Sequence, residues 1–123
     1  NKKVVHKFIL TRMKEKPDES KRTASVFGKR LRERRVQLKM SQELLGASIG
    51  LDESCSRTRI SRYESGLHEP KIATALLIAN QLDLPLAYLY CERDSLAELL
   101  LELNLISEDK IKAIIKLVRS ATN

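Results

Sequence analysis

The sequence predicts an all-α fold, and three observations support this prediction. Apolar residues make up 42% of the 123-residue chain and are mostly Leu and Ile, whereas aromatic residues make up only 4%. With three prolines and four glycines, the chain has long stretches without helix breakers. Apolar residues also recur at helical spacing in several separate segments. A chain of this length is enough for one compact domain and too short for two ordinary ones.

Positive charge is concentrated in the first third of the chain. The formal net charge is +7. Residues 1–40 hold 14 Lys/Arg against 4 Asp/Glu, a net of +10, whereas residues 41–71 hold 4 against 5 and residues 72–123 hold 5 against 7. Such a field attracts a polyanion such as DNA, which releases counterions on contact. A basic segment that is merely solvated explains the charge equally well.

Several classes of protein are excluded by the residues that bear chemistry. Cys55 and Cys91 are too few for a disulfide scaffold and lack the spacing of a zinc site, so we expect two reduced thiols and no metal or other cofactor. His6 and His68 are isolated, and no nucleophile–base set or glycine-rich phosphate loop is recognisable, so we expect no enzyme. No apolar run approaches the about 18 residues of a membrane span, and no signal peptide is visible.

Residues 1–24 are expected to form a basic N-terminal arm or linker. Val4-Val5 and Phe8-Ile9-Leu10 form a short apolar cluster that can pack as a strand or a helix. The polar stretch that follows contains Pro17, which is typical of a linker. Such an arm can lie along DNA phosphates or remain a solvated tail, and both interpretations stay open.

The first helix is expected to begin after Ser25, which can cap it, and to end near residue 38 or 39. Phe27, Leu31 and Leu38 share one face of this helix. Basic residues lie largely on the other faces, namely Lys29, Arg30, Arg32 and Arg34.

A second, short helix is expected over residues 42–49, with Ser41 as its cap. Leu45 faces inward, and Gly46 stands where the lack of a side chain lets another helix approach. Gly50 is expected to end the helix in the left-handed conformation.

The third helix is the expected centre of function and covers about residues 53–65, after a turn at 51–56. Asp52, Ser54 and Ser56 are alternative caps for its start, and Gly66 follows its end.

Ile60 and Tyr63 lie on the inner face of this helix. The opposite face carries short polar and Arg side chains, namely Ser54, Arg57, Thr58, Ser61, Arg62 and Ser65. Arginine can donate two hydrogen bonds to guanine, and small hydroxyls let a helix sit close to base edges. An ordinary solvated face is the alternative for this segment taken alone.

Two further helices are expected before residue 91. The first covers about residues 71–82, and its predicted buried residues are Ile72, Ala75, Leu76, Ala79 and Leu82. Leu77 and Ile78 widen its apolar face and need a cover. Pro85 starts the second, which holds Leu86, Leu89 and Tyr90.

The C-terminal residues 92–123 are expected to form a helical hairpin. Ser95-Leu-Ala-Glu98 has the pattern of a capping box, and Ser107 can cap the last helix. The inward residues of the two helices are predicted to be Leu96, Leu99, Leu100 and Leu103, and Ile111, Ile114, Ile115 and Val118. This hairpin can cover Leu77 within one chain or meet its twin in a second chain.

Several motifs, in order, resemble the Xre/Cro family of phage-repressor-type helix-turn-helix regulators. They span about residues 26–91 and are Gly28-Lys-Arg-Leu-Arg-Glu-Arg-Arg35, Met40-Ser-Gln-Glu-Leu-Leu-Gly46, Ile60-Ser-Arg-Tyr-Glu-Ser-Gly66, Pro70, and Leu76-Leu-Ile-Ala79 to Leu86-Ala-Tyr-Leu89. The resemblance implies a five-helix, lambda-repressor-like DNA-binding domain that acts as a dimer on two half-sites.

The resemblance also implies roles for individual residues. The positions that match base-reading or backbone-contacting residues of the third helix, which we expect to contact bases, are Arg57, Thr58, Ser61 and Arg62. Gln42 and Lys71 match residues that contact DNA phosphates, and Arg59 is expected to do the same. Arg35 and Glu64 match a charged pair that ties the first helix to the end of the third. Its expected value lies in orienting the recognition helix, because such a pair can cost as much stability as it contributes.

One departure from the family pattern affects the recognition helix. Ten residues separate Gly50 from Ile60, where the family has six, so about four are inserted around residues 52–55. Since four residues are close to one helical turn, the insertion can lengthen the helix at its start with its faces in phase. Alternatively, the turn is simply longer.

The sequence therefore predicts a transcriptional regulator that binds double-stranded DNA as a homodimer, with residues 25–91 as its DNA-binding domain. We expect a repressor that is associated with the nucleoid in the bacterial cytoplasm, or is encoded by a phage. The alternative function is a protein-interaction module, such as an antitoxin or adaptor, whose partner binds the C-terminal Leu/Ile helices.

Overall fold

The structure is a computed structural model that describes residues 25–123. This part of the chain contains seven α-helices and no strand, which confirms the predicted all-α class. The helices are α2 (Val26–Gln37), α3 (Gln42–Ser48), α4 (Ser56–Ser65), α5 (Ile72–Gln81), α6 (Leu86–Tyr90), α7 (Asp94–Leu103) and α8 (Glu108–Thr122). The predicted basic arm, residues 1–24, lies outside the described residues.

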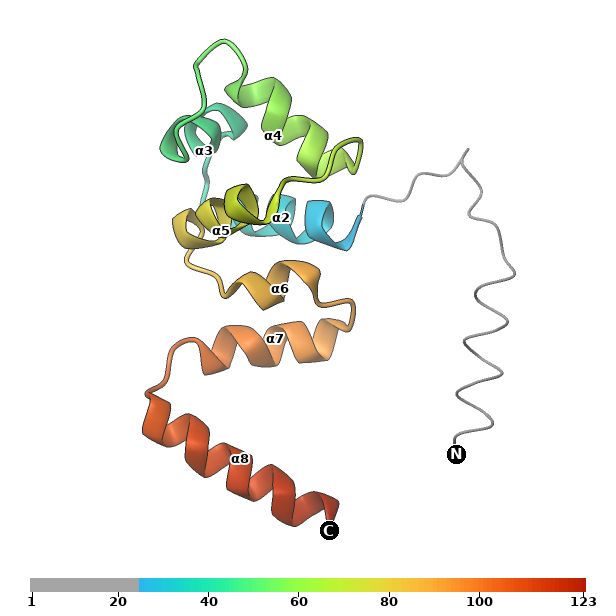
Figure 1. Ribbon diagram of the computed structural model, residues 1–123, viewed down its shortest axis with the longest axis vertical. Helices are drawn as coiled ribbons and strands as arrows, with labels where there is room; N and C mark the ends of the chain where they lie inside the picture. Colours follow the sequence, from blue (N-terminus) through green and yellow to red (C-terminus); the bar gives the residue numbers. More distant parts are fainter. Residues whose placement is uncertain (1–24) are drawn as a thin grey trace, which may run out of the picture.

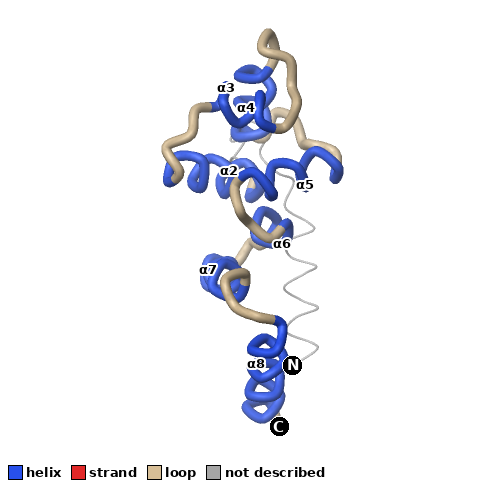
Figure 2. The backbone as a smooth tube through the Cα atoms, turned by 90° about the vertical axis from the view of Figure 1, so that its left-hand side faces the viewer, coloured by secondary structure: helices blue, strands red, loops and turns tan. Residues whose placement is uncertain are grey.

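The helices are stacked along one long axis. Helices α3 and α4 lie at one end over α2 and α5, and α6, α7 and α8 follow in turn toward the other end (Figures 1 and 2). Helix α4 packs against both α2 and α3, and α6 packs against α2, α5 and α7. The recognition element and the C-terminal helix therefore lie at opposite ends of the molecule.

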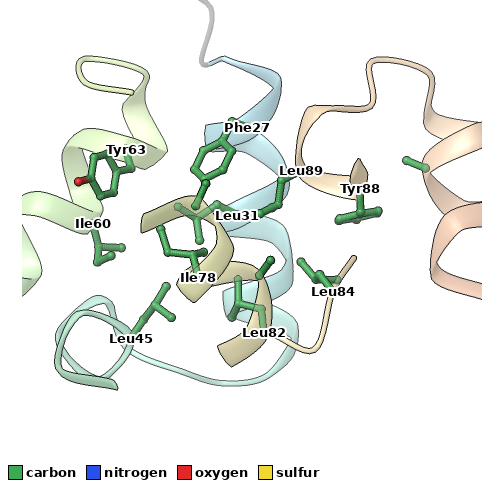
Figure 3. Packing of buried hydrophobic residues seen from close by; sticks show 13 residues of the cluster. Phe27, Leu31, Leu45, Ile60, Tyr63, Ile78, Leu82, Leu84, Tyr88 and Leu89 are labelled. Atoms are coloured by element: carbon green, nitrogen blue, oxygen red, sulfur yellow. The ribbon is translucent and has the colours of Figure 1, made fainter. Parts of the chain in front are cut away.

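One hydrophobic core joins helices α2 to α6, and Ala97 of α7 reaches its edge. Leu31 of α2 lies at its centre, among Phe27, Ile78 and Leu89 (Figure 3). Burying one such side chain contributes about 1.5 to 3 kcal/mol. The inward positions predicted in this core that are buried are Phe27, Leu31, Leu45, Ile60, Tyr63, Ala75, Ala79, Leu82 and Leu89.

The predicted helix caps are present at three of the helices. Ser25 Oγ accepts a hydrogen bond from the Gly28 N–H at 3.0 Å, and Ser41 and Ser107 cap α3 and α8 in the same way. Gly50 (φ +89°) and Gly66 (φ +79°) have the left-handed backbone expected after α3 and α4. These caps satisfy amide and carbonyl groups that a helix end leaves without partners.

Helix α5 is turned relative to the prediction. Its inner residues are Ala75, Ile78 and Ala79, whereas Ile72 and Leu76, both predicted to be buried, are exposed. Because residues 75–79 are all apolar, periodicity alone cannot choose the buried face. Packing against α3 and α6 chooses it.

Two other predictions, at Leu38 and Arg30, are wrong. Leu38 follows the last residue of α2 and is exposed. Tyr90 is 43% exposed at the end of α6, where its ring lies 5.2 Å from that of Phe27. Burial and, to a lesser degree, the charge of Glu69 raise the pKa of the Tyr90 hydroxyl. Arg30, predicted on an outer face, is buried.

The two C-terminal helices are present, but their apolar faces are largely uncovered. Helix α7 starts at Asp94 without a side-chain cap, so the predicted capping box at Ser95 does not form. Leu96 and Leu99 are exposed, and no residue of α8 is buried. Helix α8 diverges from α7 (Figure 1). Leu77 remains 49% exposed, so the hairpin does not cover it within the chain.

Candidate nucleic-acid interface

Helix α4, the predicted recognition helix, begins at Ser56, three residues later than predicted. The inserted residues form a separate turn, in which the N–H groups of Cys55 and Ser56 both donate to the Asp52 carbonyl, at 3.0 and 2.9 Å. The Ser56 hydroxyl donates to the same carbonyl at 2.9 Å. The insertion therefore lengthens the turn rather than the helix, which is the second of the two alternatives.

Cys55 is the N-cap residue of α4, and none of the three predicted caps fills that role. Its thiol donates to the Asp52 carbonyl at 3.4 Å and is partly buried. The turn pairs the amides of Cys55 and Ser56, and no side chain caps the amides that follow.

Close backbone contact fixes where α4 begins relative to α3. A Cβ on Gly46 would lie 2.6 Å from the Ser56 Cβ and 2.8 Å from its Cα. A second contact fixes the other end, since a Cβ on Gly28 of α2 would lie 2.4 Å from the Glu64 carbonyl oxygen. Glycine at these positions allows α4 to lie directly on two neighbouring helices.

Glu64 ties the inner side of α4 to two other helices. Arg35 Nε and Nη2 of α2 donate to the two carboxylate oxygens of Glu64 at 2.5 and 3.3 Å. Gln42 Nε2 of α3 donates to Oε2 at 2.7 Å, and Arg35 Nη1 donates to the Met40 carbonyl at 2.8 Å. The predicted ion pair is thus present and buried, with exposed side-chain fractions of 12% and 6%. A buried charge pair with these additional hydrogen bonds holds one orientation of α4.

The outer face of α4 is exposed and basic. It is opposite the buried Ile60 and Tyr63, and all five residues predicted to contact DNA from this helix lie on it: Arg57, Thr58, Arg59, Ser61 and Arg62. At 100° per residue, Thr58 and Ser65 lie almost directly opposite these two buried residues, with Ser61 and Arg62 to either side. Their side chains are therefore the first that a surface approaching α4 would meet.

The two flanks of this face adjoin different helices. On one flank, Arg57 lines a hollow with Ser41 and Gln42 at the start of α3. On the other, Arg59 and Arg62 line a groove with His68 and Lys71, which precedes α5. The structure therefore brings Gln42 and Lys71 to the two sides of α4.

Two basic residues near α4 were missed at the sequence level. Arg32 of α2 lines a hollow with Gln42 and Ser61, and His68 lies in the groove with Lys71. Neither has a local signal, because only the packing of α2 against α4 and the course of the chain after Gly66 bring them there. Ser65 lies on the same face, but its hydroxyl donates to the Arg62 carbonyl at 3.2 Å.

Charge in the described part of the chain is local rather than general. Residues 25–123 hold 15 Lys/Arg against 13 Asp/Glu. Basic residues nevertheless outnumber acidic ones by five to one in α2 and by three to one in α4, where the single acid, Glu64, is paired.

In the described residues, no cluster of His, Cys, Asp and Glu suits a metal ion, and none of the helices has the length and apolar composition of a membrane span.

Comparison with known proteins identifies this arrangement of helices. Residues 31–89 match the Helix-turn-helix family. Three solved chains match the structure, among them transcriptional regulator BswR, with a TM-score of 0.69 and 34% sequence identity over 76% of this chain and 92% of that chain. A search of curated proteins gave no match. The chain belongs to the Xre/Cro, lambda-repressor-like family of helix-turn-helix DNA-binding transcriptional regulators.

Proposed function

We propose that this DNA-binding regulator recognises a specific double-stranded operator by inserting α4 into the major groove. The observation that carries the proposal is the combination of an exposed Arg, Thr and Ser face with the buried network at Glu64 behind it. The major groove admits an α-helix and presents a distinct donor and acceptor pattern for each base pair. A helix held in one orientation can match its side chains to that pattern and so distinguish one base sequence from another.

Base contacts are assigned to Arg57, Thr58, Ser61 and Arg62. Thr58 lies opposite the core, and the long side chain of Arg62 projects from beside it when α4 faces the groove. Arginine suits guanine, through two hydrogen bonds to O6 and N7, and the threonine methyl suits the methyl group of thymine. Arg57 and Ser61 lie on the flank toward α3 and read neighbouring bases.

Phosphate contacts are assigned to Gln42, Arg59 and Lys71. Gln42 Nε2 uses one hydrogen for Glu64 and has a second that a phosphate oxygen can accept. Arg59 and Lys71 are exposed on the opposite flank of α4, so the two sets can contact phosphates on both sides of the groove. Such contacts set position and affinity, not base preference.

The functional unit is proposed to be a homodimer, with residues 25–91 as the DNA-binding unit and residues 92–123 as the association element. Leu96, Leu99 and Leu103 of α7 follow the alternating spacing of three and four residues of a coiled coil, and so do Ile111, Ile114 and Val118 of α8. Most of these side chains are half-buried or exposed. Two copies that pair these faces bury them, and a twofold dimer matches two half-sites.

Charge supports the same pairing. Helix α7 carries three acidic residues and no basic one, whereas α8 carries Lys110, Lys112, Lys116 and Arg119. Contact between α7 of one copy and α8 of another therefore brings opposite charges together around the apolar faces.

A DNA-binding unit and an association element are sufficient for a repressor, which is the role we assign. A dimer that occupies an operator excludes other proteins from the same stretch of DNA, and it needs no further domain to do so. We assign the protein to the compartment that holds the DNA, the bacterial cytoplasm.

Selection of bound duplexes from a random pool tests the proposal. A palindromic consensus of two half-sites is expected, and its enrichment should be lost in Arg62→Ala, while Gln81→Ala, at an exposed position at the end of α5, serves as the control. Recovery of random sequences by the wild-type chain contradicts sequence-specific binding.

A second candidate function is a protein-interaction module such as an antitoxin or adaptor. The observation that favours it is the exposed apolar face of α8, none of whose residues is buried. An adaptor has no need of the basic outer face of α4. A gel shift against random duplex at low and moderate salt separates the two cases, because an adaptor should give no salt-dependent shift. Both functions can coexist in one protein.

A further inference from the structure

Arg30 is a buried arginine that has no role in the proposed contacts with DNA. It lies on α2, is 5% exposed, and belongs to the DNA-binding unit. Its Nε donates to the Cys91 carbonyl at the end of α6 at 2.7 Å, and its Nη2 donates to Asp94 Oδ1 in the first turn of α7 at 3.1 Å. The guanidinium carbon lies 5.3 Å from the centre of the Tyr88 ring. One side chain therefore contacts α6, the segment that follows it and α7.

The segment that Arg30 contacts joins the proposed DNA-binding unit to the proposed association element. Only Cys91, Glu92 and Arg93 connect α6 to α7, and Ala97 is the single buried residue of α7. Leu101 adds a half-buried contact, so the apolar contact that restrains rotation of α7 about its own axis is small. A forked guanidinium that binds a backbone carbonyl and a carboxylate at once restricts that rotation further.

Helix α2 joins this contact to the recognition helix. Arg35, on the same helix, holds Glu64 of α4, while Arg30 holds Asp94 of α7. Two ion pairs, five residues apart on one helix, therefore link α7 to α4, in addition to the packing of α2 on α4 and of α6 on α7.

We propose that Arg30 is a positioning residue that determines which half-site spacing the dimer accepts, although it touches no DNA. This inference depends on the proposed homodimer. When the association element is rigidly joined to each DNA-binding unit, the two α4 helices present a fixed separation, and one spacing of half-sites fits. When the joint turns freely, several spacings fit about equally well.

The test measures binding of the full chain to duplexes whose two half-sites are separated by spacers that vary in steps of one base pair. Wild type should prefer one spacing strongly. In Arg30→Lys that preference over the neighbouring spacings should fall by about tenfold, the size of one charged hydrogen bond. Affinity for a single half-site should stay unchanged. Asp94→Ala, at a side chain that is 81% exposed and lies outside the core, should give the same flattening.

Two matched controls accompany these variants. Arg34→Lys changes an arginine one turn farther along α2 that donates to the Leu82 carbonyl within the DNA-binding unit, so the spacing preference should survive. Asp109→Ala changes an exposed acid in the first turn of α8 and should also preserve it.

A second measurement needs no DNA. Spin labels at Ser65 on α4 and Glu98 on α7, in a chain with both cysteines replaced by Ser, should give a narrow distance distribution that Arg30→Lys broadens. An unchanged distribution, or an unchanged spacing preference, overturns the role of Arg30. A wild-type chain that binds no two-half-site duplex contradicts the proposed function itself, so the two failures are distinct.

Discussion

Arg35 of α2 and Glu64 of α4 form a buried ion pair across 29 positions of the chain, and Gln42 of α3 donates to the same carboxylate. The three helices that build the candidate DNA interface thus meet at one acid. The Glu64 carboxylate faces away from the outer face of α4, so its contribution to DNA binding acts through the orientation of that helix.

Glu64→Ala should lower the free energy of unfolding by about 3 to 5 kcal/mol, because it leaves the Arg35 charge buried without its partner. Chemical denaturation measures this loss. Arg32→Ala, at an exposed arginine of α2, is the control and should lower the free energy of unfolding far less.

The double variant Arg35→Met with Glu64→Leu separates stability from orientation. Apolar replacement of a buried pair is often neutral, so most of the stability should return. Operator affinity should nevertheless be lower than that of the wild type, since α4 is no longer held by directional hydrogen bonds. Full recovery of affinity along with stability would show that the pair has no orienting role.

Arg62→Ala and Arg57→Ala should relax base preference at the positions they contact, at a cost of about 1 to 3 kcal/mol each in operator binding. The loss should vanish on a duplex with the corresponding base pair changed. Competition binding with single-base operator variants measures it. Equal losses on every sequence would reassign these residues to phosphate contact.

Gln42→Ala and Lys71→Ala should weaken binding to all sequences alike, because phosphates carry no base identity. Lys71→Ala should also reduce the slope of log K against log salt by about 1. Titrations at several salt concentrations provide the slope. Gln81→Ala, at an exposed position at the end of α5, should leave it unchanged.

Gly46→Ala should destabilise the protein, although alanine is the better helix former. The gain in helix propensity is at most about 1 kcal/mol, whereas overpacking costs typically about 1 to 3 kcal/mol. The new Cβ would meet the Cα of Ser56 at 2.8 Å, and no change of rotamer moves a backbone atom away. Thermal unfolding detects the change, with Ala47→Ser at the exposed neighbouring position as control.

Val118→Glu should convert the proposed dimer to a monomer, because a carboxylate placed among the apolar residues of α8 cannot be buried without a partner. Sedimentation velocity measures the molecular mass. Ala113→Glu, on the opposite, exposed face of the same helix, should leave the dimer intact. Operator binding that survives in a Val118→Glu monomer, with undiminished affinity, counts against the dimeric mode.

Local signals in the sequence predicted much of the fold. Ser25, Ser41 and Ser107 cap the helices they were expected to cap, and Gly50 and Gly66 follow the ends of α3 and α4 as expected, because a cap depends on only a few neighbouring residues. The pairing of Arg35 with Glu64 was also predicted, but from family resemblance rather than from local chemistry.

Predictions failed where the outcome depends on distant parts of the chain. The apolar run in α5 could not indicate that Ile78 would be buried and Leu76 exposed, since both positions fit a helix and only packing against α3 and α6 distinguishes them. Residues 52–55 fitted either a longer helix or a longer turn, and the hydrogen bonds to the Asp52 carbonyl decide for the turn.

The sequence by itself determined the helical class, the caps of α2, α3 and α8 and the residues available on α4, because each follows from spacing and residue type along a short segment. Tertiary structure alone decided that Arg30 would be buried against α7 and that Arg32 and His68 would lie beside α4. The reason is physical: a charged side chain on a helix has no preferred partner until another helix presents a carbonyl, a carboxylate or a ring within reach, as Cys91, Asp94 and Tyr88 do for Arg30.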